Sequence, residues 1–232
     1  MLKTERMDRV RAALRAQGLT QMIVCDPKSV WYLTGVAVEP YERLLALYLP
    51  TEGEPVLFLN RLFNVPEPPC RTVWHTDTDK PVAQIAEVVD AGRPLGIDKE
   101  WPAKFLIPLM ETHPGMQVVL SSDCVDDCRA CKDAEEQTLM REASRINDAV
   151  NEAAKHYIKA GMTEREVAEF IDAQYRAHGC EGPSFTTIVS FGANAADPHH
   201  EPDDTVLKEG DCVLFDMGCV KSRYCSDMTR TW

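Results

Sequence analysis

Two kinds of pattern alternate along residues 1–125, and this alternation is what most constrains the fold. Met7, Val10 and Leu14 form a helical stripe. Further helical patterns occupy 82–91 and 103–112, and short apolar runs that suit strands occupy 21–25, 44–49, 55–59, 72–74, 95–98 and 117–120. Strands that alternate with helices predict an α/β layer, in which helices pack on a mostly covered sheet.

The pattern changes at a polar joint over residues 121–132. A long helix follows, in which apolar residues recur every three or four positions: Leu139, Ala143, Ile146, Val150, Ala153 and Tyr157. Asp133 with Glu136, and Thr163 with Glu166, each fit a capping box that begins a helix. Strands are expected at 185–191, 211–218 and 224–231. We therefore expect one domain at 1–125 and a second domain at 126–232, in which helices precede strands.

The composition excludes several classes of partner. The chain has 25 basic and 37 acidic residues and no Lys/Arg run, which argues against nucleic acid and against an anionic membrane. Its longest apolar stretch, 44–49, is far shorter than the ~20 residues of a membrane span. The N-terminus lacks an apolar signal segment, and the nine cysteines lack framework spacing. We therefore expect reduced thiols and a cytoplasmic location.

Asp216 and Asp227, eleven residues apart, are the most informative pair in the chain. If two strands join at a turn over Lys221-Ser222, the two aspartates lie directly opposite, with Cβ atoms about 4.5–5.5 Å apart. Like charges at that distance destabilise the pair, whereas a divalent cation between them would bind carboxylate oxygens at about 2.0–2.6 Å. A solvated acidic hairpin is the alternative, since the net charge is −12.

The cysteines and histidines give weaker signals. Cys124, Cys128 and Cys131 cluster, but a structural zinc needs four ligands, so coincidence is the better interpretation. His199 and His200 lie in a loop, where binding groups concentrate, although in isolation a solvated His-His turn between acidic residues is the better interpretation. The other histidines read as structural or solvent-facing: His75, His113, His156 and His178.

Several segments, in this order, resemble the pita-bread metallopeptidases, which include Xaa-Pro aminopeptidases, prolidases, methionine aminopeptidases and creatinases. The matching segments are VWYLTG (30–35), RACKDAEE (129–136), PSFTTIVSFGANAADPHHEP (183–202), KEGDCVLFDMG (208–218) and YCSDMTRT (224–231). The resemblance covers essentially the whole chain. It implies an α/β creatinase-like N-terminal domain at 1–125, then an α+β pita-bread catalytic domain at 126–232, of which about the first half is present. The N-terminal domain favours the Xaa-Pro branch.

The resemblance also implies roles for individual residues. Asp216 and Asp227 become ligands of two divalent ions (Mn²⁺, Co²⁺ or Zn²⁺), with Asp227 bridging them. His199 becomes a catalytic residue that lies beside the metals and donates a hydrogen bond to the substrate, while His200 receives no firm role. The family's remaining ligands, one His and two Glu, come from a second half that this chain does not reach. On that pattern, the chain as given should bind metal poorly and turn over little.

The implied function is metal-dependent hydrolysis of the peptide bond before proline, by a homodimeric Xaa-Pro aminopeptidase or dipeptidase acting on proline-containing peptides. Two alternatives remain open. One is a catalytically inactive truncated module for binding or assembly, which the missing half-domain favours. The other is a metal-independent amidinohydrolase of the creatinase type, which the presence of both aspartates disfavours.

Overall fold

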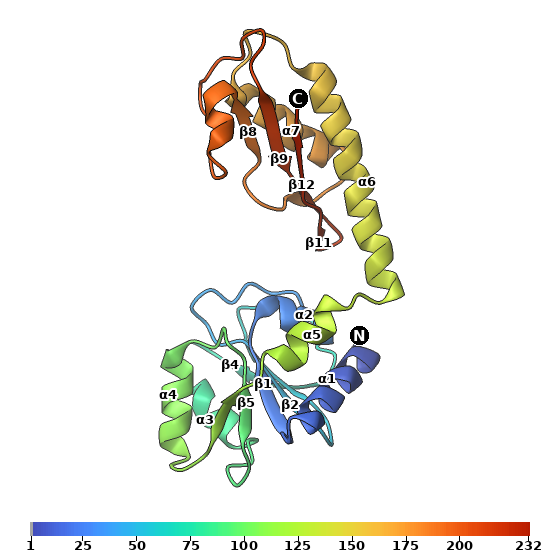
Figure 1. Ribbon diagram of the computed structural model, residues 1–232. Coiled ribbons are helices and arrows are strands. Elements are labelled where there is room, and N and C mark those ends of the chain that lie inside the picture. Colours follow the sequence, from blue (N-terminus) through green and yellow to red (C-terminus); the bar gives the residue numbers. More distant parts are fainter. Residues whose placement is uncertain (1) are drawn as a thin grey trace. The chain divides into compact units, whose positions relative to one another are not determined.

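The structure is a computed structural model that describes residues 2–232. The chain forms two compact units, of which the first ends at Cys131 and the second begins at Lys132 (Figure 1). The sequence placed this boundary earlier, after residue 125. The difference arises because helix α5 (Asp123–Ala130) buries Cys124 and Val125 in the core of the first unit.

The first unit is built on one mixed six-stranded sheet. Its strands follow the order β4-β3-β2-β1-β5-β6. They are β1 (Gln21–Val24), β2 (Ala46–Pro50), β3 (Val56–Asn60), β4 (Arg71–His75), β5 (Leu95–Ile97) and β6 (Val118–Leu120). Strand β1 pairs antiparallel with β2 and parallel with β5. The α/β architecture predicted for this part of the chain is confirmed.

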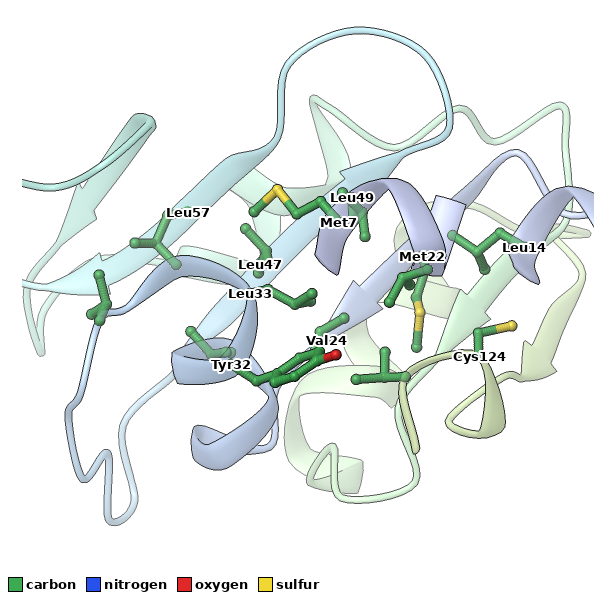
Figure 2. Close-up of a cluster of buried hydrophobic side chains, with 14 of the residues drawn as sticks. Met7, Leu14, Met22, Val24, Tyr32, Leu33, Leu47, Leu49, Leu57 and Cys124 are labelled. Atoms are coloured by element: carbon green, nitrogen blue, oxygen red, sulfur yellow. The ribbon is translucent and has the colours of Figure 1, made fainter. Parts of the chain in front are cut away.

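Helices cover both faces of this sheet. Side chains of α1 (Thr4–Ala16), α2 (Pro27–Thr34) and α5 pack in one buried cluster, and those of α3 (Pro81–Ala86) and α4 (Ala103–Thr112) pack in another. Successive side chains of β1 point to opposite faces of the sheet, so this strand contributes to both clusters. Met22 and Val24 belong to the first cluster and Ile23 belongs to the second. Figure 2 shows the first cluster, where Tyr32 and Leu33 of α2 lie beside Val24 of β1.

The second unit packs two helices against short antiparallel strands. Two three-stranded sheets have the orders β12-β9-β8 and β11-β10-β7. Its elements are α6 (Ala134–Tyr157), α7 (Glu164–Ala177), β7 (Gly182–Pro183), β8 (Ile188–Phe191), the 3₁₀ turn η1 (Gly192–Ala196), β9 (Val213–Met217), β10 (Cys219–Lys221), β11 (Tyr224–Cys225) and β12 (Met228–Thr231). Both predicted capping boxes are present and begin α6 and α7. Within residues 2–232, no helix combines the length and apolar character that crossing a membrane requires.

Strand β9 separates a buried face from an open one. Val213, Phe215 and Met217 are buried in a cluster with residues of α6 and α7. Leu214 and Asp216 alternate with them and are only half-buried. The helices therefore cover one face of the sheet, and Asp216 lies on the other.

Candidate metal centre

The hairpin that carries both aspartates turns one residue later than the sequence suggested. Ser222 and Arg223 form the turn, with φ values of 51° and 67°. Two consecutive left-handed residues are what a type I′ turn requires. Lys221 pairs with Tyr224 across this turn, so the expected turn at Lys221-Ser222 is wrong. The ladder is shifted by two residues from the predicted register.

This shift places the two aspartates diagonally rather than directly opposite each other. Asp216 pairs with Thr229, and the register is the same on both sides of the break in the strands, so Asp227 lies opposite Gly218. The predicted direct opposition is therefore wrong. A shift of two residues preserves the face of every side chain, whereas a shift of one would reverse it. The orientation of the Asp227 side chain stays a prediction, because residues 226–227 lie between the regular strands.

Gly218 allows the two halves of the hairpin to approach closely. A Cβ atom at this position would lie 2.1 Å from the carbonyl oxygen of Ser226 and 2.3 Å from Oγ of Ser184. That carbonyl accepts a hydrogen bond from the Ser184 hydroxyl at 2.8 Å. Cys219 N instead donates to Oγ of Ser226 at 3.0 Å. Residue 218 therefore has to be a glycine, because a Cβ atom there would clash with the backbone of Ser226, next to Asp227.

The two carboxylates have few partners within the protein. Oδ1 of the half-buried Asp216 accepts a hydrogen bond from Oγ1 of Thr229 at 2.8 Å, which shows that these two side chains share a face. Asp227 is exposed, and among residues 2–232 no donor or cation contacts its carboxylate. Carboxylate oxygens without protein partners suit a hard divalent cation. The pair fits as part of a metal ligand set.

The backbone beside Asp216 is held from the helix side. Asn147 of α6, which is buried, donates from Nδ2 to the carbonyl oxygen of Met217 at 3.0 Å. The hydroxyl of Tyr175 on α7 donates to Oδ1 of Asn147 at 2.5 Å. Burial raises the pKa of Tyr175, so the phenol keeps the proton that it donates. This network fixes the end of β9 from beneath, because an unpaired buried polar group would be costly.

The two loop histidines have different surroundings. His199 is exposed, and its backbone N–H donates to Oδ1 of Asp197 at 2.9 Å. His200, which the sequence left without a role, has a side chain only 14% exposed, and its Nε2 lies 2.6 Å from Oε2 of Glu164. Sequence reasoning missed Glu164. An acidic residue in the first turn of a helix is so common that the sequence offered no signal for it.

Glu164, His200 and Asp203 bring ligand atoms within 4.8 Å of one another. The arrangement does not suit a metal, because backbone and side-chain N–H groups already point at the carboxylates. Asp203 N donates to Oε2 of Glu164 at 3.1 Å. Thr205 donates to Asp203 through its hydroxyl and its backbone N–H, and these bonds hold the pKa of Asp203 below its usual range. The group is a hydrogen-bonded cluster.

The other sequence candidates show no binding arrangement. Burial raises the pKa of Cys124 to about 11 and also raises that of Cys128, so both thiols are held protonated rather than as metal-binding thiolates. The remaining histidines have ordinary partners: His75 with the Leu44 carbonyl, His113 with the Ala86 carbonyl, His156 with Glu152 and His178 with the Gln174 carbonyl.

Comparison with known protein families matches each unit. The Creatinase/Prolidase N-terminal domain matches residues 6–131, and Metallopeptidase family M24 matches residues 138–232. An uncharacterized peptidase of Staphylococcus epidermidis is 30% identical over 226 residues, covering 96% of this chain and 64% of the relative. The putative dipeptidase YkvY of Bacillus subtilis is 31% identical, covering 98% of this chain and 65% of the relative.

Solved structures agree with this assignment. The dipeptidase PepE from Mycobacterium ulcerans has a TM-score of 0.89 at 30% identity, covering 99% of this chain and 64% of its own. A recombinant prolidase from Thermococcus sibiricus also has a TM-score of 0.89, at 29% identity, covering 100% of this chain and 65% of its own. The chain thus spans about two thirds of the length of the relatives that it matches.

Membership of family M24 implies divalent metal ions, which agrees with the donor set at Asp216 and Asp227. The two units and their matches lead to one conclusion. The chain belongs to the creatinase/prolidase family of pita-bread metallopeptidases, in the branch of the Xaa-Pro peptidases, and carries a creatinase-type N-terminal domain followed by a family M24 domain.

Proposed function

We propose that this protein hydrolyses the peptide bond preceding proline, as a metal-dependent Xaa-Pro dipeptidase or aminopeptidase. The observation that carries the proposal is the hairpin, which brings Asp216 and Asp227 into diagonal register and leaves the Asp227 carboxylate without a partner among residues 2–232. Relatives named as dipeptidase and prolidase support the choice of substrate.

Each proposed residue has a distinct role. Asp216 and Asp227 would hold divalent cations, Mn²⁺, Co²⁺ or Zn²⁺. When bound, such cations supply Lewis acidity toward the peptide carbonyl. His199 would donate a hydrogen bond to the substrate oxygen as negative charge develops there. Gly218 would keep the two aspartates at their spacing.

The proposal extends to a homodimer in the cytoplasm. All nine cysteines are free, which suits a reducing compartment. The homodimer rests on the family resemblance, and a mass near 26.0 kDa in sedimentation equilibrium would contradict it.

The metal ligands can be tested without any turnover. Mn²⁺ is titrated calorimetrically into the metal-free protein and into an Asp227→Asn variant. The expected loss of affinity is at least about tenfold, since even changes to the partners of ligands cost that much. Glu209→Gln is the matched control, because it neutralises an exposed carboxylate of the same unit that we do not place at the site. Equal Mn²⁺ affinity in wild type and Asp227→Asn would refute the assignment.

The substrate is tested separately with Ala-Pro, Ala-Ala and creatine, each with Mn²⁺ and with a chelator. We expect slow cleavage of Ala-Pro only, in line with the low turnover that the family pattern implies for these residues, and loss of that cleavage with the chelator. Creatine hydrolysis that survives the chelator would instead favour the amidinohydrolase. Absence of all three activities in a protein that binds Mn²⁺ would contradict the peptidase role and favour a module for binding or assembly.

A further inference from the structure

A buried carboxylate joins the start of α7 to the segment that carries His199. The side chain of Glu164 is 0% exposed. Its Oε1 accepts hydrogen bonds from Phe191 N at 2.7 Å and from Asn194 Nδ2 at 3.0 Å. Its Oε2 accepts from Asp203 N at 3.1 Å and lies 2.6 Å from His200 Nε2. One side chain therefore gathers the end of β8, the η1 turn and the loop beyond it.

His200 is the basic member of this cluster. Among residues 2–232, no lysine or arginine pairs with Glu164, and the neighbouring Arg165 pairs with Asp204 instead. A fully buried carboxylate is costly unless it is hydrogen-bonded and its charge is compensated. The helix N-terminus contributes part of that compensation. An ionised carboxylate only accepts hydrogen bonds, so Nε2 of His200 is the donor in the 2.6 Å contact with Oε2 in the tautomer that carries the proton on Nε2.

The backbone of His199 is joined to this cluster through His200 and Asp197. His200 N donates to the Asp197 carbonyl oxygen at 3.2 Å, and His199 N donates to Oδ1 of the same aspartate at 2.9 Å. The exposed His199 side chain has no bond of its own that would fix it among the described residues. Its position therefore depends on the backbone that His200 and Glu164 hold.

We propose that His200 is a positioning residue: its hydrogen bond to Glu164 fixes the loop that presents His199 to the site. The catalytic consequence rests on the proposed function, whereas the structural tether does not. Since neither His200 nor Glu164 belongs to the proposed ligand pair, Mn²⁺ affinity should be unchanged when the tether is broken. That separates a failure of this proposal from a failure of the metal assignment.

The tether is tested by amide hydrogen exchange on the 232-residue chain, without metal or substrate. His200→Phe keeps a ring but removes the donor, and it should accelerate exchange at the Phe191 and Asp203 amides by about 10- to 100-fold. His200→Gln places an amide nitrogen where Nε2 stood, so it should restore most of the protection. His199→Phe is the matched control, since it changes the adjacent histidine in the same way and should leave both amides protected.

Two further readouts separate positioning from general destabilisation. The Phe215 amide in β9 is the internal reference, and the Cε1–H resonance of His199 should move in His200→Phe and return in His200→Gln. If exchange at the Phe215 amide shows that His200→Phe destabilises the whole unit, His200→Asn is used as the variant without the tether. The asparagine side chain is shorter, so its amide cannot reach Glu164. Protection that is equal in the Gln and Asn variants, or loss that is equal in His199→Phe and His200→Phe, would overturn the proposal.

Discussion

A single methyl group at position 218 should open the hairpin that holds the acidic pair. In Gly218→Ala, the new Cβ would lie 2.1 Å from the Ser226 carbonyl oxygen, 2.9 Å from its carbonyl carbon and 2.3 Å from Oγ of Ser184. Non-bonded heavy atoms settle at about 3.5 Å or more. The serine hydroxyl can rotate away, but the backbone carbonyl can move only if the strand moves.

The loss of stability expected for Gly218→Ala depends on which of these atoms can move away from the new Cβ. Inserting a methyl group into a packed site costs about 1–3 kcal/mol, and the lower values apply where side chains can adjust. Because the closest contact is to backbone, we expect the upper end, about 3 kcal/mol, which corresponds to roughly 150-fold in an unfolding equilibrium. The displaced strand also carries Asp227 away from Asp216, so Mn²⁺ affinity should fall as well.

Amide exchange at Phe215, in the core of the second unit, measures this destabilisation directly. The double variant Ser184→Ala with Gly218→Ala should recover part of the loss, because it removes one of the two contacts, and Ser184→Ala alone is its control. Exchange in Gly218→Ala within about threefold of wild type would show that the hairpin accommodates a Cβ, and the spatial argument for this glycine would be wrong.

Two further predictions concern the shifted pKa values of Glu166 and Cys124. Hydrogen bonds from the backbone N–H of Thr163 and, to a lesser extent, from its hydroxyl lower the pKa of Glu166. The ionised carboxylate therefore stabilises the start of α7 at pH values above the ordinary pKa of a glutamate. This contribution is lost as the pH falls through the lowered pKa. The protection factor of the amides at the start of α7, which corrects for the intrinsic slowing of amide exchange toward pH 3, should therefore fall less between pH 6 and pH 3 in Glu166→Gln than in wild type. Equal decreases in the two proteins would contradict this. Burial raises the pKa of Cys124 to about 11, whereas Cys225 is exposed, so iodoacetamide at pH 8 should label Cys225 before Cys124. Peptide mass spectrometry measures this order, and earlier labelling of Cys124 would contradict the prediction.

Local sequence signals were sufficient for the helices of the second unit. Asp133 with Glu136 and Thr163 with Glu166 satisfy the first N–H groups of α6 and α7 with side chains only three residues away. Such a signal depends on nothing distant in the chain. That is why both helix starts were predicted correctly.

Helices without a clear stripe were missed in the first unit. Helix α2 has an Asp26 cap, Pro27 in its first turn and Gly35 at φ 75° after its end, but its residues are apolar on most sides. Helix α5 is mostly polar, and only Cys124 and Val125 are buried, so it resembled a linker. In both cases the partner surface, rather than the periodicity, determines the helix.

The site was predictable in its residues but not in its register. Ser222 and Arg223 are both non-glycine residues with positive φ, so no Asn-Gly or Asp-Gly pair marked the turn. The partnership of His200 with Glu164 was equally inaccessible, because the residues are 36 positions apart and neither carries a distinguishing motif. Long-range contacts of this kind become visible only in the folded chain.

The two-residue turn also restricts which length changes the hairpin can accept. As long as the turn keeps two residues, insertions or deletions of even length there would slide the strands and leave the faces of Asp216 and Asp227 relative to each other unchanged. A change of odd length would direct one of the acids toward the helices, among Phe215 and Met217, where an unpaired charge is expensive. Natural changes of length at this turn should therefore involve even numbers of residues. Insertion or deletion of a single residue would displace a proposed metal ligand without substituting Asp216 or Asp227.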